Sequence, residues 1–308
     1  MNKSNLNTFD LVMISTFIHD EYISFLLNSI EANNDKISIK LILVKQGDFP
    51  YRIPKLDGSL LYIEMIETGL IGLSAARNIA LDYIIACGYS SRLVMFPDDD
   101  TTFDEVFFNN FCQVTLSHSN YLMPIKDSPT SFYKRFDIPD GKLLKKSDFI
   151  YVGSPNMLID FQLFKENIRF DENLGVGSRY GSCEDVDFFL KTNSILEFKF
   201  TSELYNFHPR KVDRYNAMAF KEILKRFKGY SSGYIYTMLK YNFKIYLLSM
   251  LFRTVAASFI FFLRLKFRLS FAYFLQFFIR IHLMIVISRS NNFNQGSSLL
   301  GTVELKSK

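Results

Sequence analysis

The chain has 308 residues, of which 48% are apolar, and a formal net charge of +5. This length suits one large domain or a domain with an appendage, and this apolar content excludes a disordered chain. The charge is unevenly divided, because residues 1–209 carry 19 Lys and Arg against 28 Asp and Glu, whereas residues 210–290 carry 15 against 2. The acidic front and the basic back of the chain therefore need separate explanations.

The cysteines give an expectation about the compartment. Cys87, Cys112 and Cys183 form no CxxC pair, and the first ten residues lack the apolar core of a secretory signal. We therefore expect the front of the chain to work in a reducing cytoplasm.

Predicted strands and helices alternate along the front of the chain. The apolar runs that predict strands are 11–17, 37–46, 59–66 and 91–97. The helix predicted after the first strand carries, at helical spacing, Ile23, Leu26, Leu27 and Ile30. A second helix is predicted over 72–88 and is closed by Gly88. This alternation predicts an α/β fold with a mainly parallel, doubly wound sheet, which binds ligands at the carboxyl ends of its strands.

Three aspartates, Asp98, Asp99 and Asp100, follow the strand predicted at 91–97. Adjacent carboxylates repel one another, so burying them requires a cation or a set of hydrogen-bond donors. One interpretation is a solvated turn, since Asp favours turns. Another is a site for Mg²⁺ or Mn²⁺. A third is a nucleophilic Asp of the phosphatase type, which usually follows the first strand, where this chain has Ser-Thr-Phe at 15–17. The motif alone does not decide among them.

A Gly-rich loop at 169–183 leads into Glu184 and Asp185 at the start of a predicted helix. Glycines let the backbone approach a ligand closely, and the helix dipole stabilises acidic residues at a helix start. Simple N-capping is the alternative for this pair. His208 lies 23 residues beyond Asp185, at the end of a predicted strand. A lone His is more often structural, but this one would complete a set of two carboxylates and an imidazole.

Five motifs together resemble a known family. They are LVMISTF (11–17), GLSAARNIAL (72–81), FPDDD (96–100), CEDVDFFL after the Gly-rich loop (183–190) and FHPR (207–210). Their order and approximate spacing resemble those of family 2 glycosyltransferases of the GT-A fold, over residues 9–210. Each motif is weak alone, whereas the ordered set is specific.

The resemblance implies a metal-dependent donor site. Asp98 and Asp100 correspond to the ends of the DxD motif, which holds Mn²⁺ or Mg²⁺ against the diphosphate of a nucleotide-sugar donor, expected here to be a UDP-sugar. Asp98 and Asp99 would also contact the nucleotide. His208 resembles the additional metal ligand of some family members. The metal would stabilise charge on the leaving nucleoside diphosphate.

The resemblance also implies a base and a nucleotide pocket. Asp185 resembles the general base that deprotonates an acceptor hydroxyl while the anomeric carbon inverts, and Glu184 would orient the acceptor or the base. The nucleotide would contact Thr16, Asp48 and Arg77. Gln46 is an alternative to Asp48, and a surface salt bridge is the alternative interpretation of Arg77.

The segment 151–160 matches the family's region before the acceptor site. Gly153, Ser154 and Asn156 are expected to touch the donor sugar or the acceptor. The alternative is a structural turn at Ser154-Pro155.

The back third is dominated by Phe, Leu and Ile over residues 242–289. A membrane span needs about 20 mainly apolar residues, yet the longest uncharged run here, 269–279, has 11. On one continuous helix, Arg253, Arg264 and Arg268 would fall within about 60° of one another and mark a polar face. An Arg at the bilayer centre costs about 2.5–3.5 kcal/mol on insertion scales, so amphipathic helices on an anionic membrane surface are expected.

The alternatives for this region are a buried bundle in a homo-oligomer interface and true or re-entrant membrane spans. Nucleic-acid binding is not expected, because bulky aliphatic residues interrupt the basic ones.

Three regions are therefore predicted. Residues 1–210 form a GT-A catalytic domain, 211–290 a membrane-associating or oligomerisation region, and 291–308 a flexible tail. The expected protein is a peripheral, inverting glycosyltransferase at the cytoplasmic face of a bacterial inner membrane, which extends a lipid-linked or growing saccharide in surface polysaccharide biosynthesis. The rivals are a nucleotidyltransferase, which would use a free nucleoside triphosphate without needing Asp185, and a non-catalytic membrane scaffold.

Overall fold

The computed structural model describes residues 7–54, 60–115, 120–134, 136–210 and 214–290, so the tail expected at 291–308 lies outside the described residues. The chain divides into two compact units. The first, here called the sheet unit, comprises Met1–Arg179 and Glu184–Val212, and the second, the helical unit, comprises Tyr180–Cys183 and Asp213–Lys308. The roles expected for the predicted domains stay predictions.

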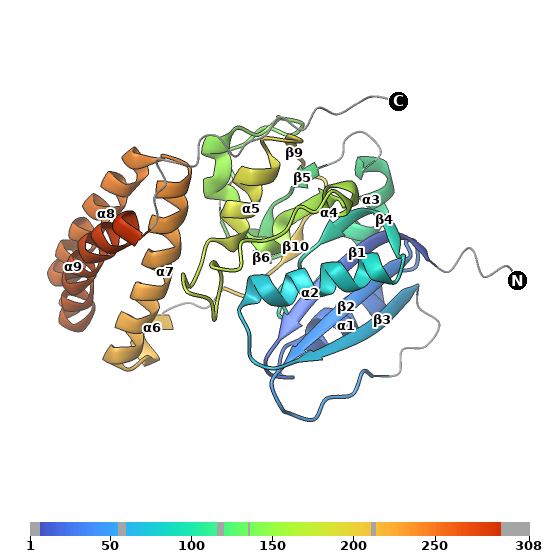
Figure 1. The fold of residues 1–308 in the computed structure, drawn as a ribbon, viewed down its shortest axis with the longest axis horizontal. Coiled ribbons are helices and arrows are strands. Elements are labelled where there is room, and N and C mark those ends of the chain that lie inside the picture. Colours follow the sequence, from blue (N-terminus) through green and yellow to red (C-terminus); the bar gives the residue numbers. More distant parts are fainter. Residues whose placement is uncertain (1–6, 55–59, 116–119, 135, 211–213, 291–308) are drawn as a thin grey trace, which may run out of the picture. The chain divides into compact units, whose positions relative to one another are not determined.

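A mainly parallel sheet forms the centre of the sheet unit (Figure 1). Within the described residues it has seven strands in the order β3-β2-β1-β4-β8-β5-β9. Their bounds are β1 Thr8–Phe17, β2 Ile39–Gln46, β3 Leu61–Thr68, β4 Ser90–Met95, β5 Asn120–Leu122, β8 Met157–Asp160 and β9 Phe198–Phe200. Only β8 runs antiparallel to its neighbours in this described sheet. A second sheet has the order β10-β6-β7, with bounds Asn206–Phe207, Ile125–Ser128 and Ser131–Phe132.

Helices cover both faces of the central sheet. Their bounds are α1 Ile23–Asn33, α2 Leu73–Ala86, α3 Glu105–Thr115, α4 Phe161–Lys165 and α5 Glu184–Thr192, with short 3-10 helices η2 at Lys146–Tyr151 and η3 at Ser154–Asn156. One apolar core joins α1 and α3 to Leu11 and Met13 of β1. Because side chains alternate along a strand, the buried Val12 and Ile14 face the other layer, where α2 lies (Figure 1).

The structure confirms the predicted α/β fold with its mainly parallel sheet and C-terminal helices. The four predicted strands are β1 to β4, with ends that differ by at most three residues. The apolar residues predicted to share one helix face are all buried in α1. Gly88 follows α2 with a φ of 69°, which a glycine adopts without strain.

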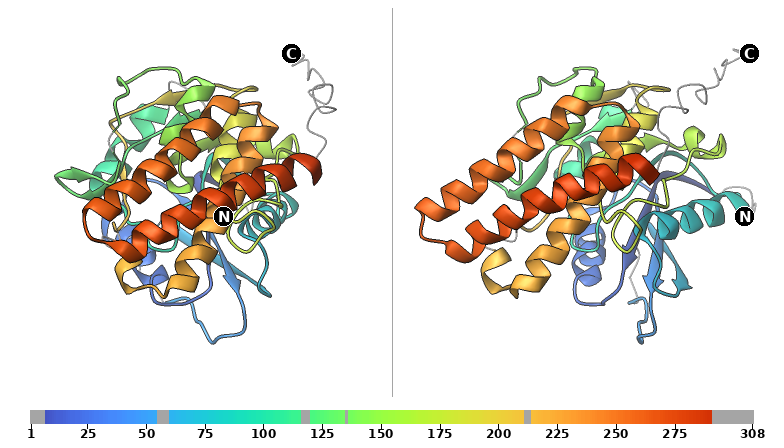
Figure 2. Two further views of the ribbon diagram at one scale, coloured as in Figure 1. Left: turned by 90° about the vertical axis from the view of Figure 1, so that its left-hand side faces the viewer. Right: turned by 60° about the vertical axis from the view of Figure 1, so that its left-hand side comes forward.

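The described part of the helical unit consists mainly of three long helices. The bounds are α6 Arg214–Ala217, α7 Phe220–Lys240, α8 Lys244–Leu263 and α9 Phe267–Ser290. Ile223 and Phe227 of α7 share a small apolar core with Leu269 and Ala272 of α9. Helix α8 packs against α9, and the two run in opposite directions side by side (Figure 2). By length and composition alone, α8 and α9 are each able to cross a membrane.

The connection between α8 and α9 corrects one expectation. Leu265 adopts a left-handed conformation with a φ of 57°. The N–H of Lys266 donates to the carbonyl of Phe261, and the N–H of Leu265 donates to that of Phe262, both at 2.9 Å. This pair of hydrogen bonds is a Schellman motif, which ends a helix.

The continuous helix on which Arg253, Arg264 and Arg268 could mark one polar face is therefore not formed. Arg253 lies within α8, Arg264 caps its end, and Arg268 lies on α9, which runs back along α8. The three arginines do not form one polar helix face. Arg268 instead donates a hydrogen bond of 2.8 Å to the carbonyl of Tyr215 within the helical unit.

The segment Tyr180–Cys183 packs closely on α7. The Ser182 hydroxyl donates to the carbonyl of Tyr230 at 3.0 Å, and the rings of Tyr180 and Tyr236 stack with centroids 4.5 Å apart. A Cβ on Gly233 would lie 2.2 Å from the carbonyl oxygen of Ser182, closer than real contacts allow. The close approach of Ser182 to α7 therefore requires a residue without a side chain at position 233.

Gly233→Ala is expected to lower the free energy of unfolding by about 1–3 kcal/mol, because an added methyl overpacks the contact with Ser182. Helix propensity alone predicts the opposite sign, since alanine stabilises a helix interior by roughly 0.5–1 kcal/mol relative to glycine. Chemical denaturation followed by circular dichroism measures the sign. Gly69→Ala is the control, because a Cβ there meets no atom within 4 Å. A stabilised Gly233→Ala variant would contradict the contact.

Candidate active site

The carboxyl end of β4 meets the strand that precedes His208. Asp98 to Asp100 form a turn that two residues separate from the end of β4, closed by a hydrogen bond of 3.0 Å from the N–H of Thr101 to the carbonyl of Asp98. Thr102 then pairs with Phe207 through two backbone hydrogen bonds of 2.9 Å. This pairing brings the side chain of His208 beside the aspartates, although about a hundred residues separate them in the sequence.

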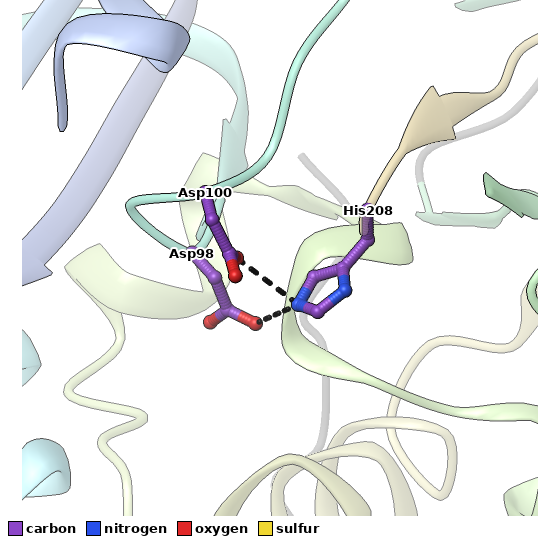
Figure 3. A group of neighbouring side chains, drawn as sticks. All are labelled: Asp98, Asp100 and His208. Atoms are coloured by element: carbon purple, nitrogen blue, oxygen red, sulfur yellow. Dashed lines mark ion pairs between the residues drawn. The ribbon is translucent and has the colours of Figure 1, made fainter. Parts of the chain in front are cut away.

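Asp98, Asp100 and His208 form a compact cluster (Figure 3). The His208 Nε2 lies 3.1 Å from an oxygen of Asp100 and 3.6 Å from an oxygen of Asp98. One ligand atom from each residue lies within 4.8 Å of the others, so the three could hold a metal ion. Two carboxylates and an imidazole suit Mn²⁺ and related divalent ions. The residues present therefore fit the metal that the sequence implies, while Asp99 occupies the middle of the turn.

His208 is protonated at neutral pH in this arrangement. Burial alone would lower the pKa of its imidazole, but hydrogen bonds and charge from Asp100 and Asp98 outweigh burial and raise the pKa to about 10. The imidazolium compensates the two carboxylates in the absence of a metal. Because a metal ligand must be deprotonated, His208 would release a proton on binding a metal here.

Metal affinity is consequently expected to rise with pH, by up to about tenfold per pH unit between pH 6 and 8 for one released proton. Calorimetric titration with Mn²⁺ in two buffers of different ionisation enthalpy measures both the affinity and the proton count. His208→Gln should flatten the pH dependence, whereas the exposed His282→Gln serves as the control. A pH-independent affinity in the unmodified protein would contradict the protonated state of His208.

Arg77 lies between this cluster and the acidic pair Glu184 and Asp185. The Arg77 side chain is 3% exposed, and its two terminal nitrogens lie 3.6 Å from a carboxylate oxygen of Asp98 and 3.6 Å from one of Glu184. Its guanidinium also lies over the rings of Phe96 and Phe170, at 5.7 and 5.4 Å. The structure thus rules out an exposed surface salt bridge for Arg77, and its predicted contact with the nucleotide stays a prediction.

Glu184, which is buried, and Asp185, which is partly buried, start α5 in an acidic environment. Burial and the neighbouring Asp185 raise the pKa of Glu184 to about 7, although Arg77 acts in the opposite direction. Burial also raises the pKa of Asp185, whereas the N–H of Val186, which donates to its carboxylate at 2.7 Å, lowers it. A carboxylate with a raised pKa is a stronger base than an exposed one.

The Gly-rich loop is fixed to α2 by residues that the sequence analysis did not single out. The Ser74 hydroxyl donates to the carbonyl of Leu174 at 2.7 Å. The Asn78 side chain both donates to the carbonyl and accepts from the N–H of Phe170. A Cβ on Gly175, whose φ is 102°, would lie 3.4 Å from the carboxyl carbon of Glu184.

These contacts explain the role of the glycine and of α2 in the site. One signal for them was present in the sequence, because the polar residues 74, 77 and 78 share one face of a mainly apolar helix. That face holds the loop, and thereby the start of α5, against the aspartate turn.

The residues expected to bind the nucleotide lie at the ends of neighbouring strands. Thr16 is the penultimate residue of β1, and Asp48 is exposed in the turn after β2. Since β1 pairs in parallel with both β2 and β4, these residues and the aspartate turn belong to the same edge of the sheet. The Gln46 side chain accepts from the N–H of Ile71 at 3.1 Å and is buried. Nucleotide contacts by Thr16 and Asp48 stay predictions.

The segment at 153–156 forms the turn η3. Ser154 and Asn156 are buried, and the amide of Asn156 closes the turn by donating to the carbonyl of Tyr151 at 3.0 Å and accepting from the N–H of Gly153 at 2.9 Å. The structural turn that was the alternative at this position is therefore present. Contacts of these three residues with a sugar stay predictions.

The site, which lies in the sheet unit, combines three chemical features. It has three residues that could hold a divalent cation, a buried carboxylate of raised pKa in Glu184, and the buried Arg77, which contacts Asp98 and Glu184. An anionic leaving group and a nucleophilic hydroxyl are the reactants that such a set accommodates.

No family model and no curated relative match the sequence. Among solved structures, the chain is similar to residues 1–349 of S. aureus TarS in complex with UDP-GlcNAc, at 16% identity over 72% of this chain and 65% of that chain, with a TM-score of 0.48. The same TarS fragment without a named ligand covers 92% of both chains at 15% identity and a TM-score of 0.49.

A third similar structure is the mannosyltransferase PcManGT from Pyrobaculum calidifontis in complex with GDP-Man and Mn²⁺, at 13% identity over 73% of this chain and 62% of that chain, with a TM-score of 0.49. The chain thus spans less than two thirds of the lengths of the TarS complex and of PcManGT. These likenesses are too distant to assign an activity to this chain.

Proposed function

We propose that the protein is a metal-dependent, inverting glycosyltransferase that moves a sugar from a nucleotide-sugar donor to a hydroxyl of a saccharide acceptor. The observation that carries the proposal is the Arg77 side chain, which contacts Asp98 of the metal-ligand cluster and Glu184 of the acidic pair at once. A donor diphosphate and an acceptor base must lie close together for this reaction, and Arg77 joins the residues suited to each. The ordered motifs of the sequence support the same assignment.

Asp98, Asp100 and His208 would hold a divalent cation, with Mn²⁺ or Mg²⁺ as the expected ion. When bound, this cation supplies positive charge for the diphosphate of the leaving nucleotide. Asp99, Thr16 and Asp48 would contact the nucleotide, and a UDP-sugar is the expected donor. Arg77 offsets the carboxylates of Asp98 and Glu184, so that an anionic donor meets less repulsion.

Asp185 would act as the general base. Its carboxylate accepts the proton of the acceptor hydroxyl while that oxygen forms a bond to the anomeric carbon, and the bond from this carbon to the diphosphate oxygen breaks. The nucleoside diphosphate leaves with the electron pair, and attack from the opposite face inverts the anomeric centre. Glu184 would orient Asp185 or the acceptor, and Gly153, Ser154 and Asn156 would line the sugar site.

The proposed acceptor is a lipid-linked or growing saccharide in bacterial surface polysaccharide biosynthesis. The helical unit supports this choice, because α8 and α9 are apolar and the region is strongly basic. Both features favour work at the cytoplasmic face of the inner membrane, where anionic lipid attracts Lys and Arg. A homo-oligomer that covers these helices is the other arrangement we consider.

The test incubates the purified protein with a panel of nucleotide-sugars and bacterial lipid extract, with and without Mn²⁺. We expect Mn²⁺-dependent release of one nucleoside diphosphate, with nuclear magnetic resonance showing an inverted anomeric configuration in the product. Release of pyrophosphate from a nucleoside triphosphate would instead support a nucleotidyltransferase. A folded protein that turns over no nucleotide-sugar would support a scaffold.

A further inference from the structure

Helix α8 exposes a continuous apolar stripe. The exposed residues, called here the α8 stripe, recur every three or four positions and are Ile245, Leu248, Phe252, Val255, Phe259 and Phe262. This spacing places them on one face of the helix. Phe252 is 75% exposed, so no described residue of the helical unit covers the centre of the stripe.

Helix α9 carries a second stripe of the same kind. Its exposed members, the α9 stripe, are Phe267, Phe271, Phe274 and Phe278. The left view of Figure 2 shows α8 and α9 side by side with α7 behind them, so both stripes contribute to an outer surface of one helical hairpin. Soluble proteins rarely expose a patch of this size unless it binds something.

Polar groups, in contrast, are enclosed between the helices. Ser258 of α8 and Ser270 of α9 exchange hydrogen bonds of 2.9 Å with each other's carbonyls. Arg280 of α9 donates to the carbonyl of Met250 at 3.0 Å and to the hydroxyl of Ser231 at 3.1 Å. Polar contacts between α8 and α9 together with exposed apolar stripes on their outer side are unlike a soluble helix pair, whose exposed face is polar, and suit helices in contact with lipid.

The positive charge of the α8–α9 hairpin favours a lipid with an anionic headgroup. Residues 244–290 contain seven Lys and Arg and no Asp or Glu. Arg264 and Lys266 are exposed at the connection between the helices, next to the exposed Leu265. Cations beside apolar side chains are complementary to an anionic headgroup layer above acyl chains.

The positions of the cations favour a hairpin that lies in the plane of the membrane. Arg253 is exposed near the middle of α8 and would reach the bilayer centre if α8 crossed the membrane. Crossing would also carry Arg264 and Lys266 to the far side, against the usual retention of basic connections in the cytoplasm. If the hairpin lies in the plane of the membrane, the side chain of Arg253 points about 100° away from that of Phe252 and can extend to the lipid headgroups.

We propose that the α8 and α9 stripes dock the protein on an anionic lipid leaflet, with both helices parallel to the membrane surface and Arg253, Arg264 and Lys266 among the headgroups. This inference specifies how the protein would bind the membrane named under the proposed function. It rests on the proposed function only in explaining why the protein works at a membrane.

Flotation of the full chain with vesicles tests the apolar part of the docking surface. The vesicles contain phosphatidylcholine alone or with phosphatidylglycerol. We expect binding to the anionic vesicles, and at least a tenfold loss in Phe252→Gln/Phe259→Gln, which alters exposed residues only. Phe25→Gln/Ile195→Gln, at exposed positions of the sheet unit, is the matched control and should bind normally. Full binding by the stripe variant would overturn the proposal.

The cations at the connection are tested in the same assay. Arg264→Gln/Lys266→Gln should weaken binding to anionic vesicles several-fold and reduce its dependence on salt, because fewer headgroup contacts remain. The control Lys36→Gln/Lys165→Gln removes two exposed cations of the sheet unit. Equal binding to neutral and anionic vesicles would contradict the choice of an anionic leaflet.

The depth at which α8 inserts into the bilayer is measurable by Trp fluorescence, because the chain contains no Trp of its own. Single-Trp variants Phe252→Trp and Leu265→Trp are bound to vesicles whose lipids carry bromine at a shallow or a deep acyl position. In-plane docking predicts that shallow bromine quenches both residues better. Stronger quenching of Phe252→Trp by deep bromine would show that α8 crosses the bilayer and would overturn the in-plane arrangement.

A second copy of the chain is the competing occupant. A protein that ignores vesicles but forms an oligomer, which Phe252→Gln/Phe259→Gln dissociates, would replace the membrane by a homo-oligomer interface. Mn²⁺-dependent nucleotide binding is measured on every variant. Since the stripes lie outside the candidate active site, membrane binding and the proposed chemistry succeed or fail independently in these measurements.

Discussion

Asp185→Asn is expected to lower kcat by about 10²- to 10⁴-fold, the range that a positioned general base contributes. Asparagine keeps the size of the side chain but cannot accept the proton of the acceptor hydroxyl. Donor binding should remain nearly unchanged, because Asp185 is not among the clustered metal ligands. The loss therefore falls on kcat rather than on the affinity for the donor, which separates a base from a binding residue.

Steady-state transfer rates and calorimetric donor titrations, made on the same preparations, measure the two quantities. Glu105→Gln is the control, since Glu105 is an exposed carboxylate at the start of α3. Burial raises the pKa of Asp185, and only its deprotonated form acts as a base, so the wild-type rate should increase as the pH rises through that pKa. Near wild-type turnover by Asp185→Asn would show that another group removes the proton.

Arg77→Met is expected to produce the largest loss of stability, about 3 kcal/mol. Methionine keeps much of the apolar contact with Phe96 and Phe170 but leaves the buried Glu184 without its cation, and removing one partner of a buried ion pair typically costs roughly 3–5 kcal/mol. Protonation of Glu184, whose pKa is already raised to about 7, places the expected loss at the lower end of that range.

Urea denaturation followed by circular dichroism measures this loss. Arg52→Met, which removes an exposed arginine, should change the free energy of unfolding by less than about 0.5 kcal/mol. Arg77→Met/Glu184→Gln should recover part of the loss, because the uncompensated carboxylate is gone. Equal stability of Arg77→Met and the wild-type protein would mean that Arg77 is not needed to offset Asp98 and Glu184.

The fold was largely predictable because the core elements follow simple periodicities. The strands β1 and β2 each contain a run of four apolar residues, as expected for strands buried on both faces, and α1 buries the four apolar residues predicted to share one face. The break between α8 and α9 was not predictable, because the left-handed position of its Schellman motif holds Leu265 instead of the usual glycine. Local sequence therefore gave no stop signal there.

The candidate site was predictable in part. The structure brings Asp98, Asp100 and His208 together, and the DDD motif with the distant histidine had indicated this set. The pairing of Thr102 with Phe207 that achieves it joins two non-local segments and leaves no local pattern. The polar face of α2 indicated an interaction of Ser74 and Asn78, but their partners at Leu174, Phe170 and Glu172 could not be named, since each lies more than 90 residues away in the sequence.

Calorimetric titration of the purified protein with a panel of nucleoside diphosphates, with and without Mn²⁺, tests the central claim most directly. The account predicts that one nucleoside diphosphate binds only with Mn²⁺, that Asp100→Ala abolishes this binding, and that Glu105→Ala retains it. Failure of the folded protein to bind any nucleoside diphosphate, or equally tight binding by Asp100→Ala, would contradict the assignment of Asp98, Asp100 and His208 as the metal site that receives the donor.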